Sequence, residues 1–294
     1  MRAVARAKVN LTVRIIGSRE DGYHELESVM QSLDLFDELS IAKSEETTVS
    51  FEWESSPAKI ERPDLAERAV GAFNSGAAAP VALRMHVTKR IPPGSGLGGG
   101  SADAAAALLA CDELAGRKLS AIELMQLGAS VGADVPFAIQ GGTAVVRGFG
   151  DHVSAMASPA EVWWVIGLTD VGLSTADVYR RFDEIGSPSG RTPKAGWDGL
   201  VKSLRNEDLV SVAAMLHNDL EQAAFDLMPS LAEAKSSLIT AGALGAVMSG
   251  SGSAVCGMCA DEDSANGLAA RVAHDFSQVL VTRSAERGAQ IVSM

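Results

Sequence analysis

Cysteine is scarce in this chain: only positions 111, 256 and 259 carry it, among 294 residues. So few cysteines exclude a disulfide framework and favour a reducing compartment. Cys256 and Cys259 spell C-x-x-C, but they lie in an apolar run that predicts a strand. A redox pair is expected at a helix start, and a zinc site needs a second pair of ligands. We therefore predict that the cysteines are small buried hydrophobic residues.

Basic residues are also in the minority, with 25 lysines and arginines against 37 acidic residues and a net charge of −12. This balance argues against nucleic-acid binding, which depends on neutralising backbone phosphates. It leaves room for a small anionic ligand, which needs only a local positive field. The sequence has no signal-peptide pattern and no apolar run of the roughly 18 residues that span a membrane. We expect a cytoplasmic protein that binds neither nucleic acid nor membranes.

Internal repeats and low-complexity tracts are absent, and at roughly 150 residues per domain the length suggests two domains. A change in character near residues 155–160 predicts domains at 1–157 and 158–294. Strand patterns cluster early in the chain and helical patterns are interposed, which favours an α+β fold over a regular βαβ array.

Four local predictions concern the stretches around the polar motifs. A helix is expected over residues 102–114, with Ser101 at its N-cap, and a capping box opens a second helix over 121–132. Residues 132–151 are expected to form turn and strand. Residues 186–199, with four glycines and two prolines, predict a loop.

Glycine is concentrated in "PPGSGLGGGSADAAAALLAC", residues 92–111. Residues 94–99 spell G-x-G-x-x-G, but this loop begins far into the chain, after two prolines, and no acidic strand end follows about 20 residues later. A Walker A loop needs a lysine that is missing here. Such loops nevertheless share exposed backbone N–H groups and a helix N-terminus, so a bound phosphate is the main interpretation. A glycine-rich turn without a ligand is the alternative.

This stretch resembles the phosphate loop of the GHMP kinases, which phosphorylate galactose, homoserine, mevalonate and related alcohols. "ARAKVNL" at residues 5–11 and "VMSGSGSAV" at 247–255 resemble the other two signatures of this superfamily, in the same order and spacing. The resemblance implies an N-terminal domain like domain 2 of ribosomal protein S5, a ferredoxin-like C-terminal domain and an active site between them. It assigns two sets of residues to ATP: the phosphate loop of Pro93, Gly94, Gly96, Leu97, Gly98, Gly99, Gly100, Ser101 and Ala102, and a second glycine turn of Ser249, Gly250, Ser251 and Gly252.

Within the superfamily, three segments resemble the branch that acts on CDP-methylerythritol in non-mevalonate isoprenoid precursor biosynthesis. They are residues 8–11 followed by 21–26, residues 132–137 and residues 173–179. The implied reaction transfers the γ-phosphoryl group of ATP to the 2-hydroxyl of 4-(cytidine 5'-diphospho)-2-C-methyl-D-erythritol.

Phosphoryl transfer depends on positioning, on charge stabilisation and on a group that orients or deprotonates the attacking hydroxyl. The resemblance gives the last role to Asp134. Lys8 lies in an apolar strand, where an unpaired ammonium would be costly, so we expect it to pair with Asp134. Asn10, on the same strand face, can contact the same substrate. Mg²⁺ is expected from the chemistry, with Ser101 as a ligand.

The only two tyrosines, Tyr23 and Tyr179, fall where the resemblance implies aromatic walls around a cytosine. It implies that His24 contacts the edge of the base and that Thr175 also contacts the substrate.

Two alternatives stay open. One is a GHMP kinase of the homoserine or mevalonate type, whose substrate carries no base. The other is a non-catalytic nucleotide sensor, which would need the glycine loop but not both Lys8 and Asp134. The sequence also leaves open a monomer or a homodimer.

Overall fold

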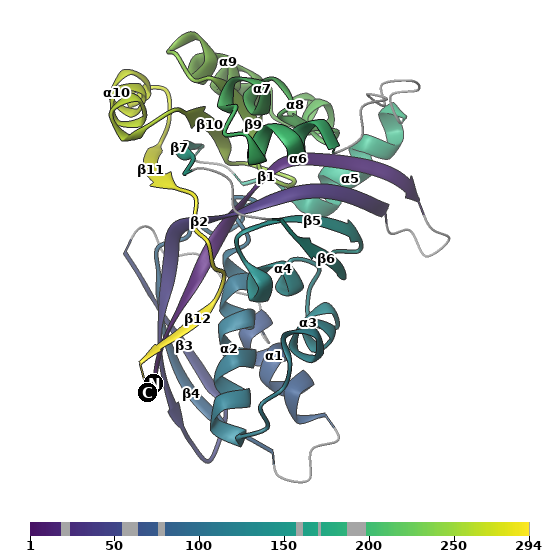
Figure 1. Ribbon diagram of the computed structural model, residues 1–294, viewed down its shortest axis with the longest axis vertical. Helices are drawn as coiled ribbons and strands as arrows, with labels where there is room; N and C mark the ends of the chain where they lie inside the picture. Colours follow the sequence, from purple (N-terminus) through teal and green to yellow (C-terminus); the bar gives the residue numbers. More distant parts are fainter. Residues whose placement is uncertain are drawn as a thin grey trace.

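The computed structural model describes residues 1–18, 24–54, 64–75, 80–156, 161–169, 172–186 and 198–293. A larger and a smaller sheet, each with its own helices, lie one above the other along the long axis (Figure 1). The strands are β1 (Arg2–Ser18), β2 (His24–Lys43), β3 (Thr48–Trp53), β4 (Leu83–Lys89), β5 (Thr143–Gly148), β6 (His152–Ala155), β7 (Trp163–Leu168), β8 (His217–Asn218), β9 (Gly245–Met248), β10 (Val255–Cys259), β11 (Gln278–Arg283) and β12 (Gln290–Ser293). The helices are α1 (Leu65–Asn74), α2 (Gly99–Ala115), α3 (Ala121–Ala129), α4 (Val135–Gln140), α5 (Thr175–Ile185), α6 (Asp198–Arg205), α7 (Leu209–Ala214), α8 (Glu221–Leu227), α9 (Ser230–Thr240) and α10 (Glu262–Val272).

The larger sheet is built on a long antiparallel ribbon of β1 and β2. The ribbon runs from Arg2 opposite Ser40 to Ser18 opposite His24. The sheet order is β12-β1-β2-β4-β3, with β5 paired to β2, β6 paired to β5, and β8 parallel to β1. Buried apolar residues alternate along β1 and β4, and they form the contact surface for the helices.

Helix α2 lies along the middle of this sheet (Figure 1); α1 and α4 also contact strands, and α3 packs on these three helices. Alanine is the commonest residue of α2, and these small side chains let the helix approach β1 and α1 closely and become buried on nearly all sides. The prediction of Ser101 as N-cap is wrong, because the helix begins at Gly99 and its N-cap is Gly98. Gly98 has a φ of 75°, which favours glycine, and Ser101 therefore lies in the first turn.

The helix α4 corrects the prediction of turn and strand over residues 132–151. Its first four residues are all buried, so this six-residue helix shows no helical alternation of apolar and polar positions in the sequence. Pro136 lies in the first helical turn, where no backbone N–H is needed. The preceding helix α3 opens with the predicted capping box but ends at Ala129.

The smaller sheet, β11-β7-β10-β9, is fully antiparallel and packs against α9 and α10. Cys256 and Cys259 lie in β10 and are buried, as predicted. Burial raises the pKa of Cys256 to about 12 and that of Cys259 to about 11, so both stay protonated thiols at neutral pH. These cysteines are packing residues rather than a redox pair.

The two ends of the chain lie side by side (Figure 1), because β12 returns from the smaller sheet to pair with β1. Arg6 strengthens this return: its Nη1 donates to the Gly288 carbonyl at 3.1 Å and to Gln290 Oε1 at 2.8 Å. The predicted boundary at 157/158 lies outside the described residues, as do residues 187–197 of the predicted loop; Asp198 already begins α6.

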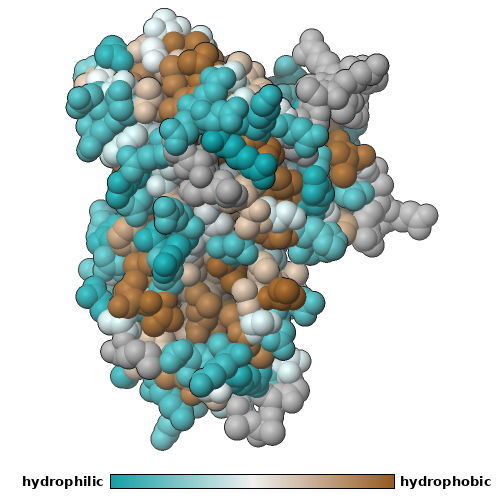
Figure 2. Space-filling model, viewed as in Figure 1, coloured by the Kyte–Doolittle hydropathy of each residue, from teal (hydrophilic) through white to brown (hydrophobic). Residues whose placement is uncertain are grey.

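Hydrophilic side chains dominate the face shown in Figure 2, where hydrophobic ones form separate groups. Among the described helices, none has both the length and the apolar character that crossing a membrane requires.

Candidate active site

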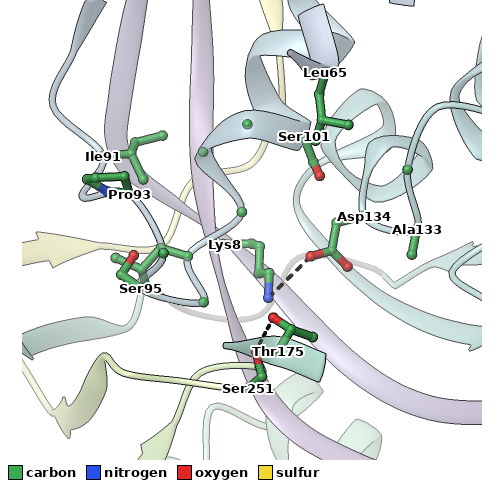
Figure 3. A pocket seen from close by; sticks show the side chains of 18 of the residues that line it. Lys8, Leu65, Ile91, Pro93, Ser95, Ser101, Ala133, Asp134, Thr175 and Ser251 are labelled. Atoms are coloured by element: carbon green, nitrogen blue, oxygen red, sulfur yellow. Dashed lines mark hydrogen bonds and ion pairs between the residues drawn. The ribbon is translucent and has the colours of Figure 1, made fainter. Parts of the chain in front are cut away.

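A cleft of about 930 Å³ opens between the larger sheet with its helices and the turn that joins β9 to β10 (Figure 3). Most of the predicted site residues line it: Lys8, Asn10, Pro93, Gly94, Gly96, Leu97, Gly98, Gly99, Gly100, Ser101, Asp134, Thr175, Tyr179, Gly250 and Ser251. Ala102 and Ser249 are buried behind the lining, and His24 and Gly252 are outside it. Tyr23 lies outside the described residues.

The glycine stretch presents backbone N–H groups to this cleft. Within the described part of the chain, nothing accepts a hydrogen bond from the N–H groups of residues 94–101. Gly96 and Gly98, with φ of 80° and 75°, turn the backbone around the space above the start of α2. Free N–H groups and the positive end of a helix dipole form a site that suits phosphate groups.

The second glycine turn packs directly on this loop. Ser249 Oγ donates to the Gly96 carbonyl at 3.0 Å, and the Ala254 N–H donates to the Ser95 carbonyl at 3.0 Å. A Cβ at Gly96 would overlap the carbonyl oxygen of Ser249, so glycine is required at this crossing. The two turns therefore form one rigid wall.

Lys8 and Asp134 point toward each other across the cleft (Figure 3). Lys8 is 5% exposed, and its Nζ lies 3.5 Å from Asp134 Oδ2 and 2.5 Å from Asn10 Oδ1. Asn10 in turn donates from Nδ2 to Ser28 Oγ at 2.9 Å. The ammonium is thus buried with two oxygen partners, which offset its lost hydration.

Asp134 occupies the position before the first residue of α4, rather than following a helix that ends at Gly132 as the sequence suggested. Its side chain makes no cap hydrogen bond to α4. About 30% of the side chain is exposed, so one carboxylate oxygen can face Lys8 while the group still meets a substrate in the cleft.

Helix α5 supplies the opposite wall. Its first residue, Thr175, places Oγ1 2.8 Å from Ser251 Oγ, and Tyr179 lies one turn later. Burial, and then the charge of Asp134, raise the pKa of Tyr179 to about 12, so its phenol remains a hydrogen-bond donor at neutral pH. The His24 ring lies 5.0 Å from the Tyr179 ring, and its Nε2 is 2.7 Å from Asp183 Oδ1.

The far end of the cleft is apolar and was missed in the sequence. It is lined by Phe51, Trp53, Leu65, Ile91 and Pro92. Phe51 and Trp53 are two residues apart on β3 and stack with ring centroids 6.4 Å apart. The available signal in the sequence was a pair of aromatic residues two positions apart, which lie on one face of a strand. A flat ring can bind between such an aromatic face and an aliphatic wall.

A buried charge cluster below the glycine loop was also missed. Lys89 Nζ contacts Asp37 Oδ2 and lies 2.6 Å from Asp103 Oδ2, while Asp37 Oδ1 accepts the backbone N–H groups of Arg90 and Ile91. Burial raises the pKa of Asp103 to about 8, although the charge of Lys89 opposes this shift. Burial alone would lower the pKa of Lys89, but the two carboxylates raise it above its usual value.

Together these groups can bind a nucleotide and act on its terminal phosphate. The apolar end suits a base, the glycine turns suit a polyphosphate, and Lys8 and Asp134 lie where the polyphosphate would end. Ser101 and Asp134 extend oxygen ligands into the same space (Figure 3), a donor set that fits Mg²⁺ held mainly by phosphates and water.

The chain matches the family described as GHMP kinases N terminal domain over residues 64–142, and GHMP kinases C terminal over residues 200–278. It is 39% identical over 282 residues to the 4-diphosphocytidyl-2-C-methyl-D-erythritol kinase of Pelotomaculum thermopropionicum, covering 96% of this chain and 97% of that protein. Identity to the protein of the same name from Desulfitobacterium hafniense is 41% over 287 residues, covering 97% and 96%.

Solved structures extend the similarity to the fold. A crystal structure of 4-(cytidine 5'-diphospho)-2C-methyl-D-erythritol kinase has a TM-score of 0.78 at 31% identity and covers 97% of this chain and 99% of its own. A homoserine kinase from Cytophaga hutchinsonii reaches 0.76 at 21% identity, covering 99% and 97%, and supports the fold alone. The predicted two-domain α+β fold is thereby confirmed. This chain belongs to the 4-diphosphocytidyl-2-C-methyl-D-erythritol kinase family of the GHMP kinases.

Proposed function

We propose that this chain transfers the γ-phosphoryl group of ATP to the 2-hydroxyl of 4-(cytidine 5'-diphospho)-2-C-methyl-D-erythritol. The observation that carries the proposal is the pairing of Lys8 with Asp134 at 3.5 Å, beside backbone N–H groups that have no acceptor among the described residues. Relatives named for this activity, similar over nearly their full lengths, support the choice of acceptor.

ATP binds with its adenine between the Phe51–Trp53 face and the aliphatic wall of Leu65 and Ile91. Its phosphates receive hydrogen bonds from the N–H groups of residues 94–101 and face the start of α2. Mg²⁺, when bound, neutralises charge on the phosphate oxygens, and Ser101 is the protein ligand best placed for it.

Asp134 accepts a hydrogen bond from the 2-hydroxyl of the acceptor. This bond aims the hydroxyl oxygen at the γ-phosphorus and lets Asp134 take up the hydroxyl proton. The hydroxyl oxygen forms a bond to phosphorus while the bond to the β–γ bridging oxygen breaks, and ADP leaves. Lys8, 3.5 Å from Asp134, stabilises negative charge that shifts onto the transferred group.

The cytidine half of the acceptor lies against Tyr179. His24, held between Tyr179 and Asp183, is the nearest described group for the edge of the base. If His24 donates its Nε2 proton to Asp183, then Nδ1 is left as an acceptor, which suits the amino group of cytosine rather than the carbonyl of uracil.

The test measures ADP release with CDP-methylerythritol, homoserine and mevalonate as separate acceptors. We expect turnover with the cytidine substrate alone. Turnover with homoserine or mevalonate instead would transfer the assignment to that type of kinase. ATP binding without turnover on any of the three would point to a nucleotide sensor.

A further inference from the structure

A buried asparagine outside the cleft, Asn218 on β8, holds the second glycine turn by its side chain. Its Nδ2 donates to the carbonyl oxygens of Met248 at 2.8 Å and Gly250 at 2.7 Å. Its Oδ1 accepts from the Leu220 N–H at 2.9 Å. Asn218 is 3% exposed, so water does not replace these partners. The amide thus uses both N–H bonds on the two carbonyls that flank Ser249.

The turn held in this way is in contact with the reacting end of the cleft. A Cβ at Gly250 would lie 3.3 Å from Lys8 Nζ and 3.6 Å from Asn10 Oδ1, which places this backbone against the buried ammonium. Ser249, between the two bonded carbonyls, donates to the Gly96 carbonyl of the phosphate loop. A shift of the turn would therefore move both Lys8 and the phosphate loop.

Asn218 is itself fixed to the strand that carries Lys8. It pairs with Val13 of β1 in a parallel arrangement, and the Asp219 N–H donates to the Val13 carbonyl at 3.0 Å. The amide of Asn218 therefore links β1 to the turn from the smaller sheet, alongside the bond from the Met248 N–H to Glu221 Oε1 at 2.9 Å.

We infer that Asn218 is a positioning residue for phosphoryl transfer, because its amide sets the glycine turn against Lys8 and the phosphate loop. This inference rests on the function proposed above. It assigns Asn218 no contact with substrate; the residue acts through the backbone carbonyls of residues 248 and 250. Misplacing reacting groups by about 1 Å can cost about 100-fold in rate, so the predicted effect is on kcat.

The variant that isolates this role is Asn218→Asp. It keeps the size of the side chain but replaces two N–H donors with an oxygen that faces two carbonyl oxygens, so the turn is repelled. Asn218→Ala removes the donors without the repulsion and should have a smaller effect. Asn206→Asp, the same change at an exposed position at the end of α6, is the matched control.

For each variant, kcat and both Michaelis constants are measured per folded molecule, and hydrogen exchange of residues 245–255 is followed by mass spectrometry. We expect N218D to lower kcat by roughly 30-fold or more, with the Michaelis constant for the acceptor within about 3-fold of wild type. Exchange should increase in residues 245–255 but not in α3. N206D should match wild type, and N218A should lie between.

A wild-type kcat in N218D, with the turn exchanging faster, would overturn the positioning role. A loss of activity only in proportion to unfolded protein, with faster exchange throughout the chain, would make Asn218 purely structural and would also overturn it. If the wild-type enzyme does not phosphorylate CDP-methylerythritol, the proposed acceptor is wrong, but this inference is not thereby refuted. In that case unchanged exchange in residues 245–255 of N218D would still contradict the role of Asn218 in holding the turn.

Discussion

Two buried lysines show how much a single residue can reveal. Lys8 interrupts an apolar alternating strand, which indicated a buried ammonium that needs a partner. The resemblance to the kinases pointed to Asp134, and the structure brings the two together. Lys89 continues the buried face of β4, in line with Met85 and Val87, but its partners Asp37 and Asp103 are 52 and 14 residues away in the chain. Because nothing local marks these partners, the second cluster could not be predicted.

Asp134→Ala should lower kcat by about 100-fold or more, because the attacking hydroxyl loses the group that orients it and can accept its proton. The dissociation constant for ATP should stay within a few-fold, since the backbone N–H groups are untouched. Steady-state kinetics and calorimetry separate the two effects. Turnover close to wild type would remove Asp134 from the mechanism.

Tyr179→Ala should raise the Michaelis constant for the cytidine substrate by about 10-fold or more, because stacking on a base contributes roughly 1–3 kcal/mol. The Michaelis constant for ATP should hardly change, since ATP binds at the other end of the cleft. Both constants come from one kinetic experiment. An equal rise in the two would contradict a base-binding role for this tyrosine.

Asp103→Asn should change how stability depends on pH. The pKa of Asp103 is raised from 3.8 to about 8 by burial, so between these pH values folding takes up a proton at this carboxyl. Its contribution to stability therefore falls as pH rises through this window, by up to about 1.4 kcal/mol per pH unit.

The asparagine variant takes up no such proton. Its free energy of unfolding should therefore rise relative to that of wild type between pH 5 and pH 8. Urea unfolding at several pH values measures the difference. The exposed Asp263→Asn serves as control, and parallel curves for D103N and wild type would argue against a protonated Asp103.

At the scale of elements, the sequence predicted strands early in the chain and the helix that follows the glycine loop, while short elements depended on context. Helix α4 is too short and too uniformly apolar to show a helical period, and its helical form depends on packing against α2 and α3. The start of α2 was misplaced because Ser101 is a good cap, whereas the tight loop needed the positive φ of Gly98. The crossing of the two glycine turns, 153 residues apart in sequence, has no local signal at all.

Gly96→Ala should disrupt that crossing, because the added methyl group would overlap the Ser249 carbonyl. We expect a lower melting temperature and a dissociation constant for ATP raised by at least about 10-fold, which corresponds to about 1.4 kcal/mol. Gly116→Ala, at the other end of α2, has a similar positive φ but open space around it, so it controls for backbone strain alone. Equal effects of the two variants would refute the crossing as the cause.

At the scale of the molecule, the cleft depends on segments from both halves of the chain. His24 and Asp183 are 159 residues apart, and Arg6 reaches Gly288 across 282 residues. The sequence, through its resemblance to a known superfamily, predicted which motifs meet, but not the contacts that bring them together.

Removing residues 289–294 should destabilise the whole protein, because β12 covers the edge of β1 and the Ala289 N–H donates to the Ala138 carbonyl at the end of α4. With each hydrogen bond contributing roughly 0.5–1.5 kcal/mol, a loss on the order of 3 kcal/mol in unfolding free energy is expected. Denaturant unfolding measures it, with Val292→Ala, an exposed position in β12, as control. A truncated protein as stable as wild type would show that the returning strand is dispensable.

The pairing of β1 with both β8 and β12 also has a kinetic consequence. The first strand of the chain cannot complete its sheet until residues more than 200 positions later have been synthesised and brought back to it. A fold with so many distant contacts is expected to form slowly, since long loops must close before those contacts stabilise anything. During that interval, the backbone edge of β1 that later pairs with β8 and β12 is open to pairing with other chains.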